Sequence, residues 1–208
     1  GDVYKRQGLT LGSPISLWIE NIDFKNWTDA MSPYPVDESV DKKEFSKTVP
    51  GHADFVGALK FKQHDLRNVL ERASARETTS RVAAGSLCKS LLKELNISIK
   101  SRVLSIGEVT SDDVDQKLEN VDWDQTEISE VRSSSKNVDE KFNDEIISSM
   151  RKITTIGGIF QVVAFNSPVG LGNFSQWDRK LDGKIAQAMM SINAVKGVEI
   201  GNGFANTK

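Results

Sequence analysis

Apolar residues recur at helical spacing in three stretches of the chain, residues 74–95, 138–152 and 178–192. Each stretch carries an apolar residue every three or four positions, so we expect three amphipathic helices. The first begins with Ser74-Ala75-Arg76-Glu77, which has the serine-to-glutamate spacing of a capping box. Asp178 is the expected cap of the third helix.

Apolar and polar residues alternate in other parts of the chain, and this pattern predicts strands. Strands are expected over 11–21, 97–106, 158–165 and, as a last short one, 195–200. Strands and helices therefore follow one another along the chain. That order by itself favours α/β layers with some parallel strand pairing.

The remaining stretches read as loops or short elements. Residues 22–51 contain three prolines and mixed charges, which indicates a long loop, and long loops are often functional. Residues 119–136 are polar and rich in serine, so we expect them on the surface. A short helix is expected over 111–118, capped by its first residues, and a glycine-containing loop over 167–176.

Composition narrows the class of protein. A chain of 208 residues with 38% hydrophobic residues is suited to one soluble domain. Its net charge of -2 gives no reason to expect nucleic acid as a partner. No apolar run approaches the roughly 18 residues that a membrane span needs, and no signal peptide opens the chain. Cys88 is the one cysteine, which excludes a disulfide framework and favours a reducing compartment, the cytoplasm.

Candidate chemistry is concentrated around the start of the first predicted helix. His52 follows a Pro-Gly turn, and Arg72 and Arg76 flank Ser74. A helix start carries partial positive charge and unpaired N–H groups, so it can bind an anion. Each residue also has an ordinary structural explanation: a histidine hydrogen-bonded in a loop, a serine cap, and arginines exposed to solvent. With two histidines and one cysteine there is no metal-ligand spacing, and no metal is expected.

Five ordered segments resemble the chorismate synthase family. They are GSPISLWIEN at 12–21, PGHAD at 50–54, RASARET at 72–78, PVGLGNFSQWDRKLD at 168–182 and SINAVKGVEIG at 191–201. The resemblance runs from about Gly8 to the end and is weakest over 112–152. It implies an incomplete fold of the α+β or α/β class, a β-α-β sandwich with helices packed between sheets. This architecture takes the place of a doubly wound sheet. The resemblance also implies a homotetramer.

The resemblance also implies a domain organisation. Residues 1–7, GDVYKRQ, do not match the family and are expected to be a non-native leader. Residues 8–208 are expected to be a partial chorismate synthase domain, an internal fragment, because the family's GESHG and RHD motifs are not found.

The activity that the resemblance implies is phosphate lyase chemistry, the last step of the shikimate pathway. 5-Enolpyruvylshikimate-3-phosphate would lose phosphate and a ring proton by 1,4-elimination to give chorismate, with reduced FMN as cofactor. A flavin-reducing system, for which NADP is the expected nucleotide, would be a partner. Neither nucleic acid nor a membrane is expected.

The family's motifs assign roles to individual residues. His52 matches the family's acid, and Arg76 matches an arginine that holds the phosphorylated substrate. The expected flavin-binding residues are Arg72, Ala73, Ser74, Asn193 and Ala194. These residues would meet in one pocket shared by a flavin and a phosphate ester. From the residues alone, Asn193 is equally explained as a helix C-terminal cap, because asparagine tolerates the left-handed conformation.

Two positions depart from the family's pattern. Val49 stands where the family usually has arginine, which removes a positive charge that Lys47 would replace only in part. Ile153-Thr154 stands where the family commonly has Gly-Asp.

Two alternatives to a working enzyme stay open. The 208 residues could be a catalytically inactive fragment, and we expect no turnover from them in isolation. Alternatively, they could form a non-enzymatic module of the same fold that binds flavin or phosphate.

Overall fold

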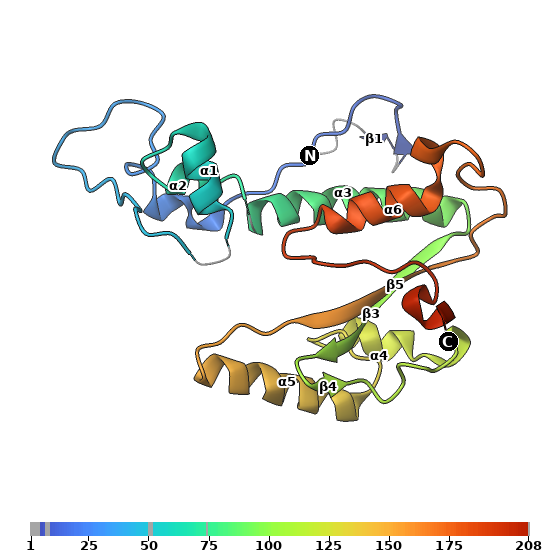
Figure 1. Cartoon of the computed structure of the whole chain (residues 1–208). Coiled ribbons are helices and arrows are strands. Elements are labelled where there is room, and N and C mark those ends of the chain that lie inside the picture. The colour runs from blue at the N-terminus through green and yellow to red at the C-terminus, as the bar shows by residue number, and fades with distance from the viewer. Residues whose placement is uncertain (1–4, 7–8, 50–51, 74, 208) are drawn as a thin grey trace. The chain divides into compact units, whose positions relative to one another are not determined.

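The computed structural model describes residues 5–6, 9–49, 52–73 and 75–207 (Figure 1). The chain divides into two compact units. The first unit comprises residues 1–85 and 190–197, and the second comprises residues 86–189 and 198–208. Helix α3 (Ala75–Glu94) and the end of helix α6 (Leu181–Met190) contribute to both units, and each unit is described by itself.

The second unit is built on an antiparallel sheet with the strand order β4-β3-β5. The strands are β3 (Ser98–Ile106), β4 (Val109–Thr110) and β5 (Gly158–Phe165). The predicted strands at 97–106 and 158–165 are confirmed. The expected parallel pairing is wrong, because every pair of described strands is antiparallel. A tight turn at Gly107, with φ 55°, makes β4 double back on β3.

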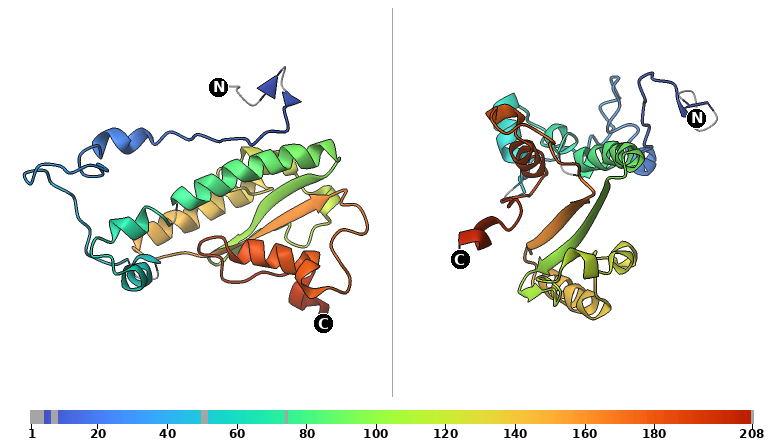
Figure 2. Two further views of the ribbon diagram at one scale, coloured as in Figure 1. Left: turned by 90° about the horizontal axis from the view of Figure 1, so that it is seen from above. Right: turned by 90° about the vertical axis from the view of Figure 1, so that its right-hand side faces the viewer.

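Two helices, α4 (Trp123–Ile128) and α5 (Lys136–Arg151), pack against β3 and form the core of the second unit (Figure 2). Val138 and Phe142 of α5 are fully buried, which confirms the amphipathic helix predicted over 138–152. The ring of Trp123 meets Phe165 edge-on, with centroids 5.6 Å apart. This geometry is favourable for aromatic pairs.

The expectation that residues 119–136 form a surface excursion is wrong. This stretch contains α4, and Val121, Thr126 and Ser133 are buried. The polar groups can be buried because they are satisfied within the segment: the Thr126 hydroxyl donates to the Asp122 carbonyl (3.0 Å) and the Ser133 hydroxyl to the Ser135 carbonyl (2.9 Å). The polar composition of this segment therefore predicted surface exposure wrongly, because its polar side chains are buried and bond to the segment's own backbone.

A buried ion pair anchors the loop after β4 to the sheet. Arg102 on β3 is 1% exposed, and its Nη1 lies 3.0 Å from the Asp113 carboxylate. The hydroxyls of Ser111 and Ser134 donate to the same carboxylate. Burial by itself raises the pKa of Asp113, but these hydroxyls and the Arg102 charge outweigh it, so the pKa lies below its ordinary value.

The same contacts explain why the helix predicted over 111–118 is absent. Residues 112–115 form a turn, followed by a 3-10 helix at Leu118–Asn120. The Asp113 carboxylate accepts hydrogen bonds from the Ser111 hydroxyl and from Arg102. Ser111 and Asp113 therefore do not cap a helix here, and the prediction is wrong.

Asp113→Asn should lower the free energy of unfolding by about 3 kcal/mol, because it leaves the buried Arg102 guanidinium without its counter-charge. The neighbouring variant Asp112→Asn is the control, since Asp112 is exposed and pairs with Lys141 only at 3.8 Å. It should change stability by less than about 0.5 kcal/mol. Urea unfolding at neutral pH measures both, and equal losses would contradict the assignment. Because the pKa of Asp113 is lowered in the folded state, its contribution should disappear as the pH falls through that lowered value.

Helix α5 ends in a left-handed residue that is not glycine. Ile153 has φ 53°, its N–H donates to the Met150 carbonyl, and the Thr154 N–H donates to the Ser149 carbonyl, both at 3.1 Å. These two bonds form a Schellman motif, in which the left-handed position is usually glycine. The structure thus explains why glycine suits position 153. Isoleucine is strained there, and its side chain, which is 94% exposed, gains no burial in return. Nothing in the structure explains the accompanying threonine at 154.

Ile153→Gly should raise the free energy of unfolding by about 1 kcal/mol, because glycine has no Cβ to strain the left-handed conformation. Lys152→Gly is the matched control, since Lys152 has an ordinary right-handed conformation with φ -80°. Glycine there should cost about 0.5–1 kcal/mol. Thermal and urea unfolding of both variants measure the difference, and a loss of stability in Ile153→Gly would refute the explanation.

The first unit consists mainly of short elements: β1 (Lys5–Arg6), β2 (Leu9–Thr10), the 3-10 helix η1 (Ile22–Asn26), α1 (Asp54–Phe61), α2 (Arg67–Leu70) and the start of α3. The strand predicted over 11–21 is wrong. That segment is extended but has no described strand beside it to accept its backbone hydrogen bonds, and Trp18 is 90% exposed. The helix predicted from Ser74 is confirmed over 75–94, whereas Ser74 itself lies outside the described residues.

Apart from η1, the described residues of the predicted loop at 22–51 form turns and irregular structure, as expected. Arg67 of α2 holds the loop: its guanidinium lies 4.5 Å from the centroid of the Trp27 ring, and Lys43 Nζ, from the loop itself, lies over the same ring at 4.5 Å. The Phe45 N–H also donates to the Asp65 carboxylate at 3.1 Å. The loop is therefore anchored to the short helix that leads to Arg72.

The C-terminal part of the chain follows the prediction only in its helix. Helix α6 (Leu181–Met190) confirms most of the predicted stretch, but Asp178 lies inside the 3-10 helix η3 (Trp177–Arg179) and does not cap α6. The strand expected over 195–200 is wrong, because that segment pairs with no described strand; the 3-10 helix η4 (Gly203–Thr207) follows it. None of the described helices is long and apolar enough to cross a membrane.

Candidate functional site

His52 lies beside a buried carboxylate at the start of α1. Asp54 is fully buried and accepts hydrogen bonds from the backbone N–H groups of Val49 and Phe55, each at 2.8 Å. The His52 Nδ1 atom is 3.7 Å from Asp54 Oδ1. The Val49 N–H is the main cause of a lowered pKa for Asp54, with smaller contributions from the Phe55 N–H and the charge of His52. Asp54 is thus an anion that attracts the protonated form of His52.

The Nδ1 atom of His52 is buried and has no hydrogen-bond partner among the described residues. The side chain as a whole is 27% exposed, so the ring can still be reached from solvent. Val49, which stands in the place of a family arginine, supports Asp54 through its backbone N–H. That support does not depend on the side chain at position 49.

Arg72 and Arg76 line one shallow hollow of about 430 Å³ at the start of α3. The hollow is lined by Glu71, Arg72, Arg76, Glu77, Ser80, Arg81 and Ala84. Arg76 forms an ion pair with Glu71, and Arg81 forms one with Glu77. Guanidinium groups converging on one open hollow are suited to phosphate or carboxylate. Ala73 lies between Arg72 and the helix, half-buried.

The second predicted segment, at 193–194, is held against the start of α3. Arg81 donates from Nη1 to the Ser191 hydroxyl (2.8 Å) and from Nη2 to the Ser191 carbonyl (3.1 Å). The Asn193 amide lies 3.4 Å from the Glu77 carboxylate. Asn193, predicted to bind the flavin, therefore contacts the residue that follows Arg76, although more than a hundred residues separate the two segments in sequence.

The left-handed residue in this segment is Ala194, with φ 69°, and not Asn193. The interpretation of Asn193 as a left-handed helix cap is therefore wrong. A left-handed alanine costs about 1–2 kcal/mol, and such strain often occurs at functional sites. It occurs here at one of the residues predicted to bind the flavin.

The structure brings together Arg72, Arg76 and Asn193, but not His52. No described contact joins His52 to these residues, and His52 does not line the hollow. The side chains that hold the segments together are Glu77 and Arg81. Sequence spacing could not identify Ser191 as their partner.

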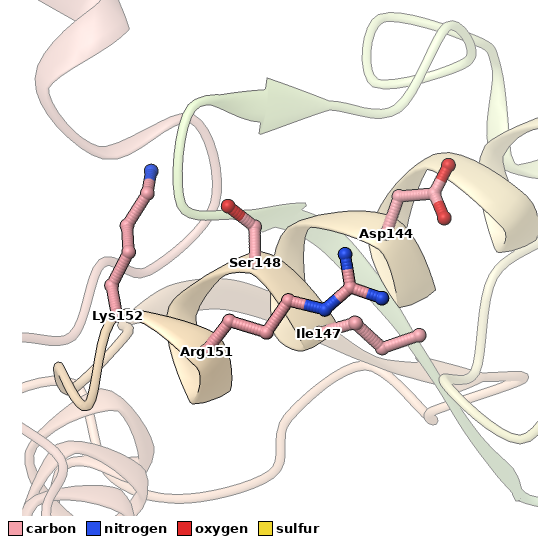
Figure 3. A pocket seen from close by; sticks show the side chains of 5 residues that line it. All are labelled: Asp144, Ile147, Ser148, Arg151 and Lys152. Atoms are coloured by element: carbon pink, nitrogen blue, oxygen red, sulfur yellow. The ribbon is translucent and has the colours of Figure 1, made fainter.

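A second hollow, of about 390 Å³, lies on the last turns of α5 (Figure 3). It is lined by Asp144, Ile147, Ser148, Arg151 and Lys152, none of which is a predicted site residue. Within the described part of the chain, no group of three or more histidine, cysteine, aspartate or glutamate side chains could hold a metal ion.

A model of the chorismate synthase family matches residues 3–208. The chain belongs to this family. It is 51% identical over 203 residues to the chorismate synthase of Sulfurihydrogenibium sp. (strain YO3AOP1), a match that covers 96% of the chain and 51% of the relative. It is 48% identical over 200 residues to that of Enterococcus faecalis (strain ATCC 700802 / V583), covering 96% of the chain and 52% of the relative. The chain thus spans about half the length of these chorismate synthases.

A solved structure confirms the fold class. A crystal structure of chorismate synthase matches with a TM-score of 0.71 at 47% identity, covering 75% of this chain and 49% of that one. The expected α+β fold of the chorismate synthase type is therefore correct. The non-native leader expected at residues 1–7 stays a prediction.

Arg81→Ala should release residues 190–197 from α3, because it removes both bonds to Ser191 and the ion pair to Glu77. We expect amide hydrogen exchange at 191–195 to accelerate about fivefold, the effect of losing about 1 kcal/mol. Lys93→Ala, on the same helix but with an exposed side chain, is the control and should leave these amides unchanged. Unchanged exchange in Arg81→Ala would show that other contacts hold the segment.

Proposed function

We propose that the chain forms part of a chorismate synthase that converts 5-enolpyruvylshikimate-3-phosphate to chorismate and phosphate by 1,4-elimination. The observation that supports this most directly is the hollow lined by Arg72 and Arg76, beside which Asn193 contacts Glu77. Family membership of the whole matched segment supplies the reaction class.

The side chains around the hollow suit the anions of this reaction. The guanidinium of Arg76 would hold the phosphate of the substrate. In the transition state charge develops on the departing phosphate, and one preorganised donor there can lower the barrier by roughly 3–4 kcal/mol. Arginine suits this role because its planar fork matches two phosphate oxygens at once.

The same region fits a flavin mononucleotide. Arg72 offers a guanidinium for its phosphate, Ala73 and Ala194 have side chains small enough for close approach, and Asn193 offers an amide at the edge of the hollow. Ser74 is assigned to the flavin from the family's motif. Reduced FMN, when bound, supplies transient electron donation to an elimination that has no net redox change.

His52 is the proposed acid. Its ring is reachable from solvent, and its Nδ1 atom lies 3.7 Å from the buried Asp54 carboxylate. Proton transfer by a positioned histidine contributes typically about 10²- to 10⁴-fold to a rate. Because His52 does not line the hollow in this structure, its approach to the ligands is part of the proposal.

The proposal extends to the setting of the enzyme. A single cysteine, exposed on α3, is consistent with the cytoplasm. A homotetramer and a flavin-reducing system using NADP are the expected partners. A non-enzymatic module is not favoured by the relatives, which are named chorismate synthase. That the 208 residues are inactive in isolation remains our expectation.

A hybrid enzyme tests the function. Residues 8–208 replace the matching segment of the Sulfurihydrogenibium chorismate synthase, and chorismate and phosphate are measured with reduced FMN in the absence of oxygen. The hybrid should turn over, whereas the isolated chain should not. His52→Ala in the hybrid should lower kcat about 10²- to 10⁴-fold, because it removes the proton donor.

His64→Ala is the matched control, since His64 is exposed and belongs to none of the family's motifs. It should leave kcat within about twofold of the parent hybrid, as expected of an exposed side chain outside the site. A soluble, folded hybrid without activity would refute the function proposed for this segment. A His52→Ala hybrid with full kcat would refute the role of His52 alone.

A further inference from the structure

We infer that Glu71 competes internally for the anion-binding guanidinium of Arg76, so that a phosphate group binds by displacing it. This inference rests on the proposed function, because it takes Arg76 to be a phosphate ligand. Arg76 Nη2 forms an ion pair with Glu71 Oε2, and both residues line the hollow at the start of α3.

The two carboxylates of the hollow are held very differently. Glu77 binds Arg81 and also accepts from Asn193, so it connects two segments of the chain. Among the described residues, the Glu71 carboxylate pairs with Arg76 alone. Glu77 is therefore part of the framework, whereas Glu71 can turn away without breaking any other described contact.

The ion pair is also easy to break. The side chains of Arg76 and Glu71 are 59% and 30% exposed, so both remain partly hydrated. Solvent-exposed pairs of this kind are weak. A phosphate monoester carries close to two negative charges at neutral pH, against one on the carboxylate, and accepts a bidentate arginine equally well. An incoming phosphate group therefore has the electrostatic advantage over Glu71.

The charge balance of the hollow points the same way. Three arginines and two glutamates line it, which leaves a net charge of +1. Removing the charge of Glu71 raises this to +2 and frees Arg76, which should strengthen binding of any dianion. If Glu71 instead only oriented Arg76 for the ligand, its removal would weaken binding.

The test is a titration of the 208-residue chain with inorganic phosphate at pH 8 and low salt, followed by phosphorus NMR and calorimetry. Glu71→Gln keeps the shape of the side chain and removes its charge, and it should tighten phosphate binding about three- to tenfold. Glu71→Asp, which keeps the charge, should remain closer to the parent chain. Glu94→Gln, at the other end of α3 and outside the hollow, should have no effect.

A double-mutant cycle decides whether Glu71 acts through Arg76. In an Arg76→Ala background, Glu71→Gln should no longer alter phosphate affinity, and thermal unfolding should show that each variant is folded. Equal tightening in both backgrounds would overturn the inference, since the effect would then be one of general charge. Unchanged or weaker binding by Glu71→Gln would also overturn it while leaving the proposed function intact. If neither the parent chain nor Glu71→Gln bound phosphate, both the inference and the proposed function would be overturned.

Discussion

The guanidinium of Arg81 is the contact on which the candidate site depends. It binds Glu77 on its own helix and both the hydroxyl and the carbonyl of Ser191, which is 110 residues away in sequence. Glu77 in turn accepts from Asn193. One arginine and one glutamate thus connect two motifs that lie in separate parts of the sequence. Without this connection, Arg76 and Asn193 would belong to unrelated segments, and a common ligand would have no structural support.

Local sequence patterns predicted the elements whose contacts are local. The helices over 75–94 and 136–151 and the strands β3 and β5 follow from periodicity, because their side chains meet neighbours on one face of one element. The failures at 11–21, 111–118 and 195–200 share a different cause. Whether those residues form strands or a helix depends on a partner elsewhere in the chain, and periodicity contains no information about partners.

The amphipathic pattern also says which face of a helix is apolar without saying what covers it. Leu91 on α3 is 66% exposed, and Ile185 on α6 is 41% exposed. On β5, Phe160 is 43% exposed and Val162 is 46% exposed. The pattern correctly predicted that these faces are apolar, but no described residues cover them.

The arginines of the site show how far residue types alone can be interpreted. Positive charge at a helix start opposes the helix dipole, so an arginine in the first turn of α3 carries a small cost. In the structure, Glu71 and Glu77 supply the compensating charges to Arg76 and Arg81, so neither arginine needs a ligand to be stable. What supports an anion site is therefore that three arginines line one hollow, beside which Asn193 contacts Glu77, and not the cost of any one arginine.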